Sequence, residues 1–144
     1  MKGRWQGFMR GEFEHVIDEK GRMFIPSKFR AELGCRFVLT KSVNNCLVAY
    51  PTADWEAFEE KLKSYPSSKS TPLLRFFVGS SQDMELDGQG RILVPQKLRS
   101  YAGLEKNIVV VGMIDHLEIW DAEAWENGIV TPETASELME ELGI

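Results

Sequence analysis

Hydrophobic and polar positions alternate at 13–17 (FEHVI) of this chain of 144 residues, as they do in a half-buried β-strand. A D-x-x-G turn follows, and then an apolar run that ends in proline, RMFIP at 22–26. Asp at the first and Gly at the fourth position suit a type I turn, so these two segments are predicted to form a hairpin. SKFRAEL at 27–33 then predicts a helix of two turns with Phe29 and Leu33 on one face.

The same order returns in the second half of the chain. DEKGRMFIPSKFR (18–30) is matched by DGQGRILVPQKLR (87–99), and six of the thirteen positions are identical. The identical pairs are Asp18/Asp87, Gly21/Gly90, Arg22/Arg91, Pro26/Pro95, Lys28/Lys97 and Arg30/Arg99. Unrelated segments would share about one identity by chance. The chain is therefore an internal duplication, and QKLRSYA at 96–102 predicts the second copy of the short helix.

Each copy continues with a predicted second hairpin and a further helix. The hairpins pair 36–41 with 46–50 across Asn44-Asn45, and 107–113 with 117–120 near Asp115. The helices are expected at 52–65 and 121–127. Trp55 and Trp125 occupy matching positions in them, and aromatic residues at helical spacing are expected in the core.

Two Thr-Pro pairs predict the starts of two more helices, because Thr can cap a helix and Pro suits its first position. Thr71-Pro72 ends a turn-rich connection between the copies, and Thr131-Pro132 precedes an acidic segment. Leu138 and Leu142 give that last helix a modest apolar stripe. A helix so short needs a docking surface, from its own chain or from a neighbour's.

A duplicated chain of this kind predicts one domain that is mainly β with short helices (α+β). One copy alone would leave sheet edges exposed and bury too little apolar surface, whereas two copies can pair their edges and close a barrel. The expected parts of this single pseudo-dimeric domain, 1–144, are repeat one at about 9–64, a linker and helix at about 65–79, repeat two at about 78–127 and the acidic helix at about 131–143.

Composition agrees with a soluble globular protein, with 43% hydrophobic and 27% charged residues. The longest apolar run, at 108–114, is too short to span a bilayer, and the start lacks the apolar core of a signal peptide. Cys35 and Cys46 have neither metal-ligand spacing nor the density of a disulfide scaffold. A reduced, cytoplasmic protein without metal, cofactor or evident small-molecule substrate is expected.

The net charge of −5 hides an uneven distribution. Residues 1–36 carry eight Lys or Arg against five acids, whereas residues 115–144 carry nine acids and no Lys or Arg. Such asymmetry is compatible with a basic binding face, although charge alone favours a solvated acidic helix beside an ordinary mixed surface.

Three explanations of the repeated motif compete. In the first, Asp18, Gly21, Pro26, Asp87, Gly90 and Pro95 form turns and helix starts, and the cations are merely solvated. In the second, two Asp residues in a duplicated β-fold form the site of a pseudo-dimeric aspartic hydrolase, but the Asp-Thr/Ser-Gly loop of such enzymes is absent. His15 and His116 are isolated in the sequence, so no enzyme is expected.

The third explanation is DNA binding. Turn-forming does not require matching cations, yet both copies carry them. They are Lys20, Arg22, Lys28, Arg30, Arg91, Lys97 and Arg99. Arginine can donate two hydrogen bonds to guanine in the major groove, while lysine binds phosphates, and a two-stranded ribbon fits that groove.

The two D-x-x-G-R segments resemble the signature segments of the MraZ family of bacterial transcriptional regulators. The lead-in GEFEHVID, the segment RFFVGSSQDMELD and the closing LEIWDAEAW are similar to the family too. The resemblance implies the AbrB-like fold, a swapped-hairpin (double-split) β-barrel, here built from two internal repeats. It also implies a cytoplasmic, nucleoid-associated, ring-shaped homo-oligomer with no membrane attachment. Such rings bind short G-rich direct repeats upstream of their own operon, which belongs to the division and cell-wall gene cluster.

In the family, the DNA-contacting D-x-x-x-R motif falls on Asp18 to Arg22 and on Asp87 to Arg91. This chain departs from the family in its first eight residues, MKGRWQGF, and in Gln89, which stands where copy one has Lys20. An AbrB-like antitoxin, which binds DNA and neutralises a toxin, is the alternative within the same fold. Antitoxins of that kind pair one repeat with a disordered tail, whereas 129–144 here predicts a capped helix.

Overall fold

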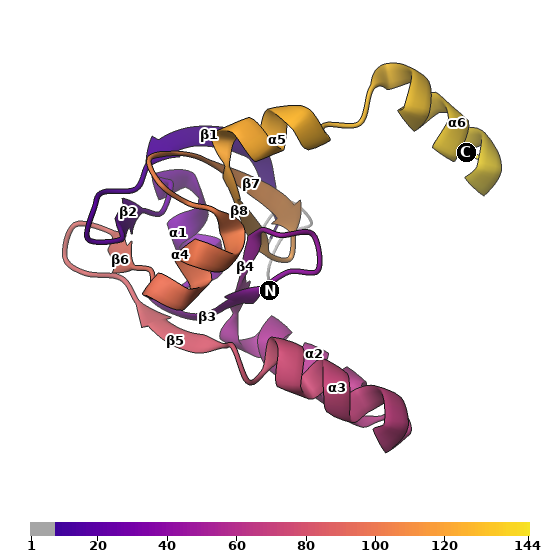
Figure 1. The fold of residues 1–144 in the computed structure, drawn as a ribbon, viewed down its shortest axis with the longest axis horizontal. Helices are drawn as coiled ribbons and strands as arrows, with labels where there is room; N and C mark the ends of the chain where they lie inside the picture. The colour runs from indigo at the N-terminus through magenta and orange to yellow at the C-terminus, as the bar shows by residue number, and fades with distance from the viewer. Residues whose placement is uncertain (1–7) are drawn as a thin grey trace.

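The computed structural model describes residues 8–144, which form eight strands and six helices (Figure 1). The strands are β1 (Met9–Val16), β2 (Arg22–Phe24), β3 (Arg36–Lys41), β4 (Leu47–Pro51), β5 (Gln82–Glu85), β6 (Arg91–Leu93), β7 (Asn107–Ile114) and β8 (Leu117–Asp121). The helices are α1 (Ser27–Leu33), α2 (Thr52–Lys63), α3 (Ser67–Phe77), α4 (Gln96–Ala102), α5 (Ala122–Gly128) and α6 (Pro132–Leu142). Apart from Phe8, the N-terminal extension noted above lies outside the described residues.

The short helices and the second hairpins are confirmed. Phe29 and Leu33 of α1 are buried, as are Leu98 and Ala102 of α4. The hairpins β3–β4 and β7–β8 are both antiparallel. Asn45 has a positive φ of 62° at the first of these turns, a conformation that Asn tolerates better than most residues.

The predicted hairpin between 13–17 and 22–26 is wrong in its pairing. β1 and β2 share only an isolated bridge, Ile17 to Met23. β1 instead pairs with β7 along its whole length, and β2 pairs with β6. The alternating pattern identifies a strand but not its partner, and the three residues of β2 are too few to form a stable hairpin alone.

The two copies therefore exchange strands. β1 of copy one lies against β7 of copy two, and β5 of copy two lies against β3 of copy one. β4 and β8 join the halves, which gives a six-stranded antiparallel sheet in the order β1-β7-β8-β4-β3-β5 beside the β2–β6 ribbon. This arrangement confirms the predicted α+β, barrel-like fold built from two repeats.

The core is shared by both copies, and matching positions of the repeats meet in it. The pairs buried together are Met23/Ile92, Ile25/Val94, Phe29/Leu98 and Leu33/Ala102. Each of these side chains except the small Ala102 contributes about 1.5–3 kcal/mol when it is removed from water. Trp55 is buried as expected, while Trp125 is half-buried, with its ring centroid 5.8 Å from that of Trp120.

The helix predicted to begin at Thr71-Pro72 begins earlier. α3 starts at Ser67 after Pro66, so that Pro72 lies inside it. Ser70, in the added turn, is buried, and packing outweighs the hydrogen bond that Pro72 cannot donate.

The C-terminal helix begins as predicted, since the Thr131 hydroxyl accepts a hydrogen bond from the Thr134 N–H. α6 points away from the barrel (Figure 1), with Leu138 and Leu142 exposed. Across residues 8–144, no helix is both long and apolar enough to cross a membrane.

Candidate nucleic-acid interface

Each D-x-x-G-R loop is organised by its aspartate. Asp18 Oδ1 accepts hydrogen bonds from the Lys20 and Arg22 backbone N–H groups, both at 2.9 Å, and Oδ2 accepts one from Arg22 Nε at 2.7 Å. In copy two, Asp87 accepts the equivalent bonds from Gln89 N at 2.8 Å, Arg91 N at 2.9 Å and Arg91 Nε at 2.9 Å. The same carboxylate thus shapes the turn and orients the arginine.

The glycine of each loop closes the turn. Gly21 N–H donates to the Asp18 carbonyl and Gly90 N–H to the Asp87 carbonyl, both at 3.0 Å. Their φ values of +92° and +82° favour glycine, because a side chain is strained in this region.

These hydrogen bonds keep both aspartates ionised. The Arg22 backbone N–H, and then its side chain, lower the pKa of Asp18, and the Arg91 backbone N–H is the main cause that lowers the pKa of Asp87. The carboxylate pair of an aspartic hydrolase shares a proton, which two ionised, arginine-bound carboxylates do not. The aspartates serve the loops.

Each of the two histidines also interacts with other residues of the fold. Burial, and then the nearby Arg30, lower the pKa of His15. His116 is not isolated, because its Nδ1 lies 2.7 Å from Asp115 Oδ1 and its ring stacks on Tyr50. The His116–Asp115 contact lies in the β7–β8 turn.

The β2–β6 ribbon brings the two loops to one end of the molecule (Figure 1). Arg22 stands opposite Leu93, and Arg91 stands opposite Phe24, so the two arginines occupy opposite ends of the three-residue ribbon. The Arg91 guanidinium lies 5.9 Å from the centre of the Phe24 ring, a contact that the sequence did not indicate. Such a contact with a ring favours a fixed position of the cation.

Arg22 and Arg91 keep a donor edge available. Their side chains are 43% and 28% exposed, and each donates to its aspartate through Nε. The two Nη atoms of a guanidinium form the fork that matches an anion or a base edge. Lys20 is exposed on the first loop, and Gln89 takes its place on the second.

Arg30 and Arg99 occupy different surroundings from the other predicted cations. Arg30 Nε donates to the Ile25 carbonyl at 2.8 Å, and Arg99 Nε donates to the Val94 carbonyl at 3.0 Å. Both arginines are only partly exposed. The structure therefore separates them from the arginines of the loop tips.

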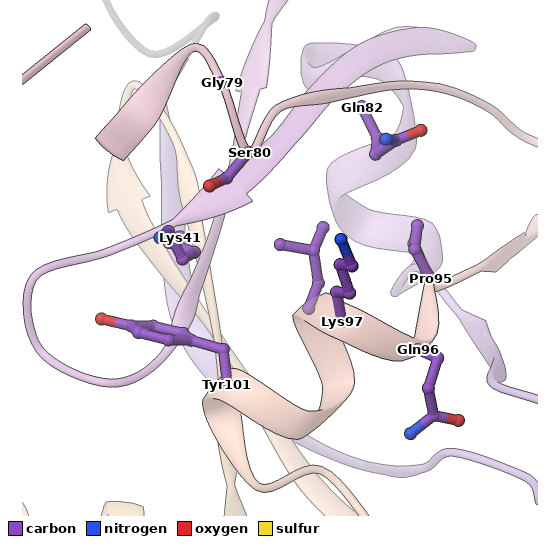
Figure 2. A pocket seen from close by; sticks show the side chains of 9 residues that line it. Lys41, Gly79, Ser80, Gln82, Pro95, Gln96, Lys97 and Tyr101 are labelled. Atoms are coloured by element: carbon purple, nitrogen blue, oxygen red, sulfur yellow. The ribbon is translucent and has the colours of Figure 1, made fainter. Parts of the chain in front are cut away.

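Lys28 and Lys97 are both exposed, on α1 and α4. The Lys28 ammonium lies 5.7 Å from the centre of the Phe13 ring. Lys97 lines a hollow of about 550 Å³ together with Lys41 (Figure 2). The Lys41 ammonium lies 4.1 Å from the centre of the Phe76 ring. The nine residues that line this hollow include no acid, so it can accept an anion such as a phosphate. Lys41 was missed because no local pattern connects it with α4.

The arrangement suits binding rather than catalysis. Two aspartate-held arginines share one ribbon, and each of the two short helices that follow its strands carries an exposed lysine. Within residues 8–144, no group of His, Cys, Asp and Glu could hold a metal ion. Cations on a narrow two-stranded ribbon can bind phosphates and base edges of a duplex.

The chain is similar to known proteins over most of its length. A family model described as "MraZ protein, putative antitoxin-like" matches residues 8–73 and again residues 76–138. A "Transcriptional regulator MraZ" of Caldicellulosiruptor saccharolyticus is 46% identical over 140 residues, which cover 93% of this chain and 98% of that protein. A protein of the same name from Pelotomaculum thermopropionicum is 50% identical over 119 residues, which cover 81% of this chain and 82% of that protein.

Proposed function

This chain belongs to the MraZ family of transcriptional regulators, and on that premise we propose that it binds double-stranded DNA sequence-specifically through its two D-x-x-G-R loops. The names of the relatives agree with the expectation that the chain is not an enzyme. The proposal assigns guanine contacts to Arg22 and Arg91, and phosphate contacts to Lys20, Lys28 and Lys97.

One observation carries the proposal: each loop holds an arginine by its Nε, and both loops belong to one ribbon. A guanidinium that is fixed in this way loses little side-chain entropy on binding, so its bidentate contact to guanine O6 and N7 can be selective. Phe24, beneath Arg91, restricts that side chain further.

The operator we propose consists of short G-rich direct repeats upstream of the chain's own operon, in the division and cell-wall gene cluster. One barrel offers a small footprint and hence modest affinity. A head-to-tail ring of copies presents several ribbons in the same orientation, and linking them multiplies modest affinities by roughly 10²–10⁴. A protein that binds its own operator would lie in the cytoplasm, in association with the nucleoid.

The apolar face of α2 is not available for contacts between copies in such a ring. Trp55 and Leu62 of α2 are buried within the chain, so the apolar face of this helix is already covered. Leu138 and Leu142 of α6 are 46% and 75% exposed, and they offer an apolar surface to a neighbouring copy.

The test is binding of the purified protein to a duplex with its own upstream sequence. We expect tight binding to a duplex with two G-rich repeats, weaker binding to one repeat and only salt-sensitive, nonspecific binding to a scrambled duplex. Equal affinity for the cognate and scrambled duplexes at one salt concentration would contradict the proposal.

A second candidate function is suggested by the description of the matching family, which includes the words antitoxin-like. An AbrB-like antitoxin would capture a toxin encoded beside it in addition to binding DNA. Co-purification from cells that also express the neighbouring gene distinguishes the two functions. A regulator without antitoxin activity does not retain the product of that gene.

A further inference from the structure

One arginine from each copy, Arg30 or Arg99, lies against the D-x-x-G-R loop of the other copy. We propose that Arg30 and Arg99 are positioning residues, each of which holds the DNA-contacting loop of the opposite repeat in place. This inference rests on the proposed function, in which those loops contact DNA. It changes the role that the sequence suggested for both arginines, from contact with DNA to support of the loop.

The support of the second loop begins in copy one. Arg30 Nε donates to the Ile25 carbonyl at 2.8 Å, and the Ile25 N–H donates to the Gly90 carbonyl at 3.0 Å. The Arg30 guanidinium also lies against Gly90 itself, since a Cβ added there would be 2.6 Å from Arg30 Nη2. Arg30 thus packs on the residue directly before Arg91.

The first loop is held in the same way from copy two. Arg99 Nε donates to the Val94 carbonyl at 3.0 Å, and the Val94 N–H donates to the Gly21 carbonyl at 2.8 Å. A Cβ added at Gly21 would lie 2.7 Å from Arg99 Nε and 2.9 Å from Arg99 Cζ. The guanidinium therefore fills the space that a side chain at Gly21 would need.

This geometry explains two features that turn formation alone does not. The loop glycines are needed for close approach as well as for their positive φ. The cation must be arginine, because a flat guanidinium can lie against a glycine while its Nε donates to a carbonyl, and a lysine ammonium has neither the plane nor that donor.

Because each arginine supports the loop of the opposite repeat, the proposal also predicts which residues are coupled in DNA binding. Loss of Arg30 should disturb Arg91, in the other repeat, and leave Arg22 undisturbed. Loss of Arg99 should disturb Arg22. An arginine that contacted DNA directly would show no such crossed dependence, since its contribution would add to that of either loop arginine.

The test uses the full-length protein and a duplex with its own upstream repeats. Arg30→Lys keeps the charge and removes the support, and we expect it to weaken specific binding roughly tenfold, as much as Arg30→Ala does. Arg75→Ala, which removes an exposed arginine from α3, serves as the matched control and should leave affinity unchanged. Wild-type affinity in Arg30→Lys would overturn the proposal, because a phosphate contact survives this change.

A double-mutant cycle tests whether Arg30 is coupled to the loop arginine of the opposite repeat. On an Arg91→Ala background, Arg30→Ala should change affinity less than about twofold, whereas on an Arg22→Ala background it should still cost roughly tenfold. Additive losses on both backgrounds, or coupling to Arg22 instead, would overturn the inference.

Hydrogen exchange separates this inference from the proposed function. Arg30→Lys should speed amide exchange at Gly90 and Arg91 and leave exchange at Gly21 and Arg22 unchanged, with or without DNA. If the wild-type protein bound no DNA specifically, the proposed function would fail, and the exchange pattern would still decide whether Arg30 supports the opposite loop. Unchanged exchange at Gly90 and Arg91 would refute that support.

Discussion

Asp18 Oδ2 and Arg22 Nε are joined by a hydrogen bond of 2.7 Å across one turn of chain, and Asp87 and Arg91 repeat the contact at 2.9 Å. The carboxylate occupies the Nε side of each guanidinium. The Nη side is the one that can meet a base edge. Each loop is therefore arranged for contact before any DNA is present.

Removal of either loop arginine should weaken binding to the cognate repeat without unfolding the barrel. We expect Arg22→Ala and Arg91→Ala each to cost about 1–3 kcal/mol and to relax preference at one base, because a bidentate contact to guanine is lost. Fluorescence anisotropy at one salt concentration measures the loss. Unchanged specific affinity in both variants would refute the assignment.

The matched comparison for these variants is Lys28→Ala, on α1. A lysine bound to phosphate carries no sequence information, so its loss should weaken cognate and scrambled duplexes alike. It should also reduce the salt slope by about 1. A change in base preference in this variant would show that Lys28 contacts a base.

Asp18→Ala should destabilise the first loop, because three hydrogen bonds to Oδ1 and Oδ2 are lost. We expect a small fall in the midpoint of thermal unfolding and faster amide exchange at Lys20 and Arg22. Glu19→Ala, an exposed acid in the same loop, is the control and should change neither. An enzyme would instead keep its stability and lose turnover, so hydrolysis of a peptide that Asp18→Ala abolishes would contradict this reading.

Stability should fall in acid through the same two aspartates. The folded protein lowers the pKa of Asp18 and Asp87 below the ordinary value of 3.8, so the unfolded chain binds more protons at low pH. Their contribution is complete above 3.8 and is lost as the pH falls through the folded pKa. Urea unfolding between about pH 2 and pH 5 should show a weaker acid dependence in the Asp18→Asn, Asp87→Asn double variant than in the wild type. Identical pH profiles for the wild type and the double variant would contradict a contribution of these aspartates to acid stability.

A single truncation in the shared core should destabilise both repeats at once. Phe29 is 1% exposed and packs in one core with Leu98 of the other copy, so Phe29→Ala should cost about 3–5 kcal/mol. Because β1 pairs with β7 and β3 with β5, we expect one cooperative transition. Circular dichroism and tryptophan fluorescence should follow the same unfolding curve. Two separate transitions would mean that the repeats fold independently.

Polar substitutions on α6 should dissociate the proposed ring. Leu138→Ser with Leu142→Ser removes the exposed apolar stripe, and affinity for a two-repeat operator should fall roughly 10²–10⁴-fold, towards that for one repeat. Glu133→Ser with Glu140→Ser changes the opposite face of the same helix and is the control. Light scattering measures the assembly. A wild-type monomer at micromolar concentration, with equal affinity for one and two repeats, would refute the proposal.

Much of the local structure could be predicted from the sequence, because it depends on neighbouring residues. The repeat identified the paired Asp-x-x-Gly-Arg loops, and apolar spacing identified α1 and α4 with Phe29 and Leu98 on their buried faces. The Thr131 cap of α6 was likewise predictable, since its hydroxyl bonds to the backbone only three residues away.

Strand partners and the roles of matching cations were decided by the tertiary structure. Alternation at 13–17 gives the same signal whether β1 pairs with β2 or with β7, and only the closed barrel selects β7. Arg22 and Arg30 look equally available in the sequence, yet only Arg30 lies against a glycine sixty residues away. A motif specifies the bonds within its own turn. Contacts between distant segments arise when two copies bury one core, and no short pattern encodes them.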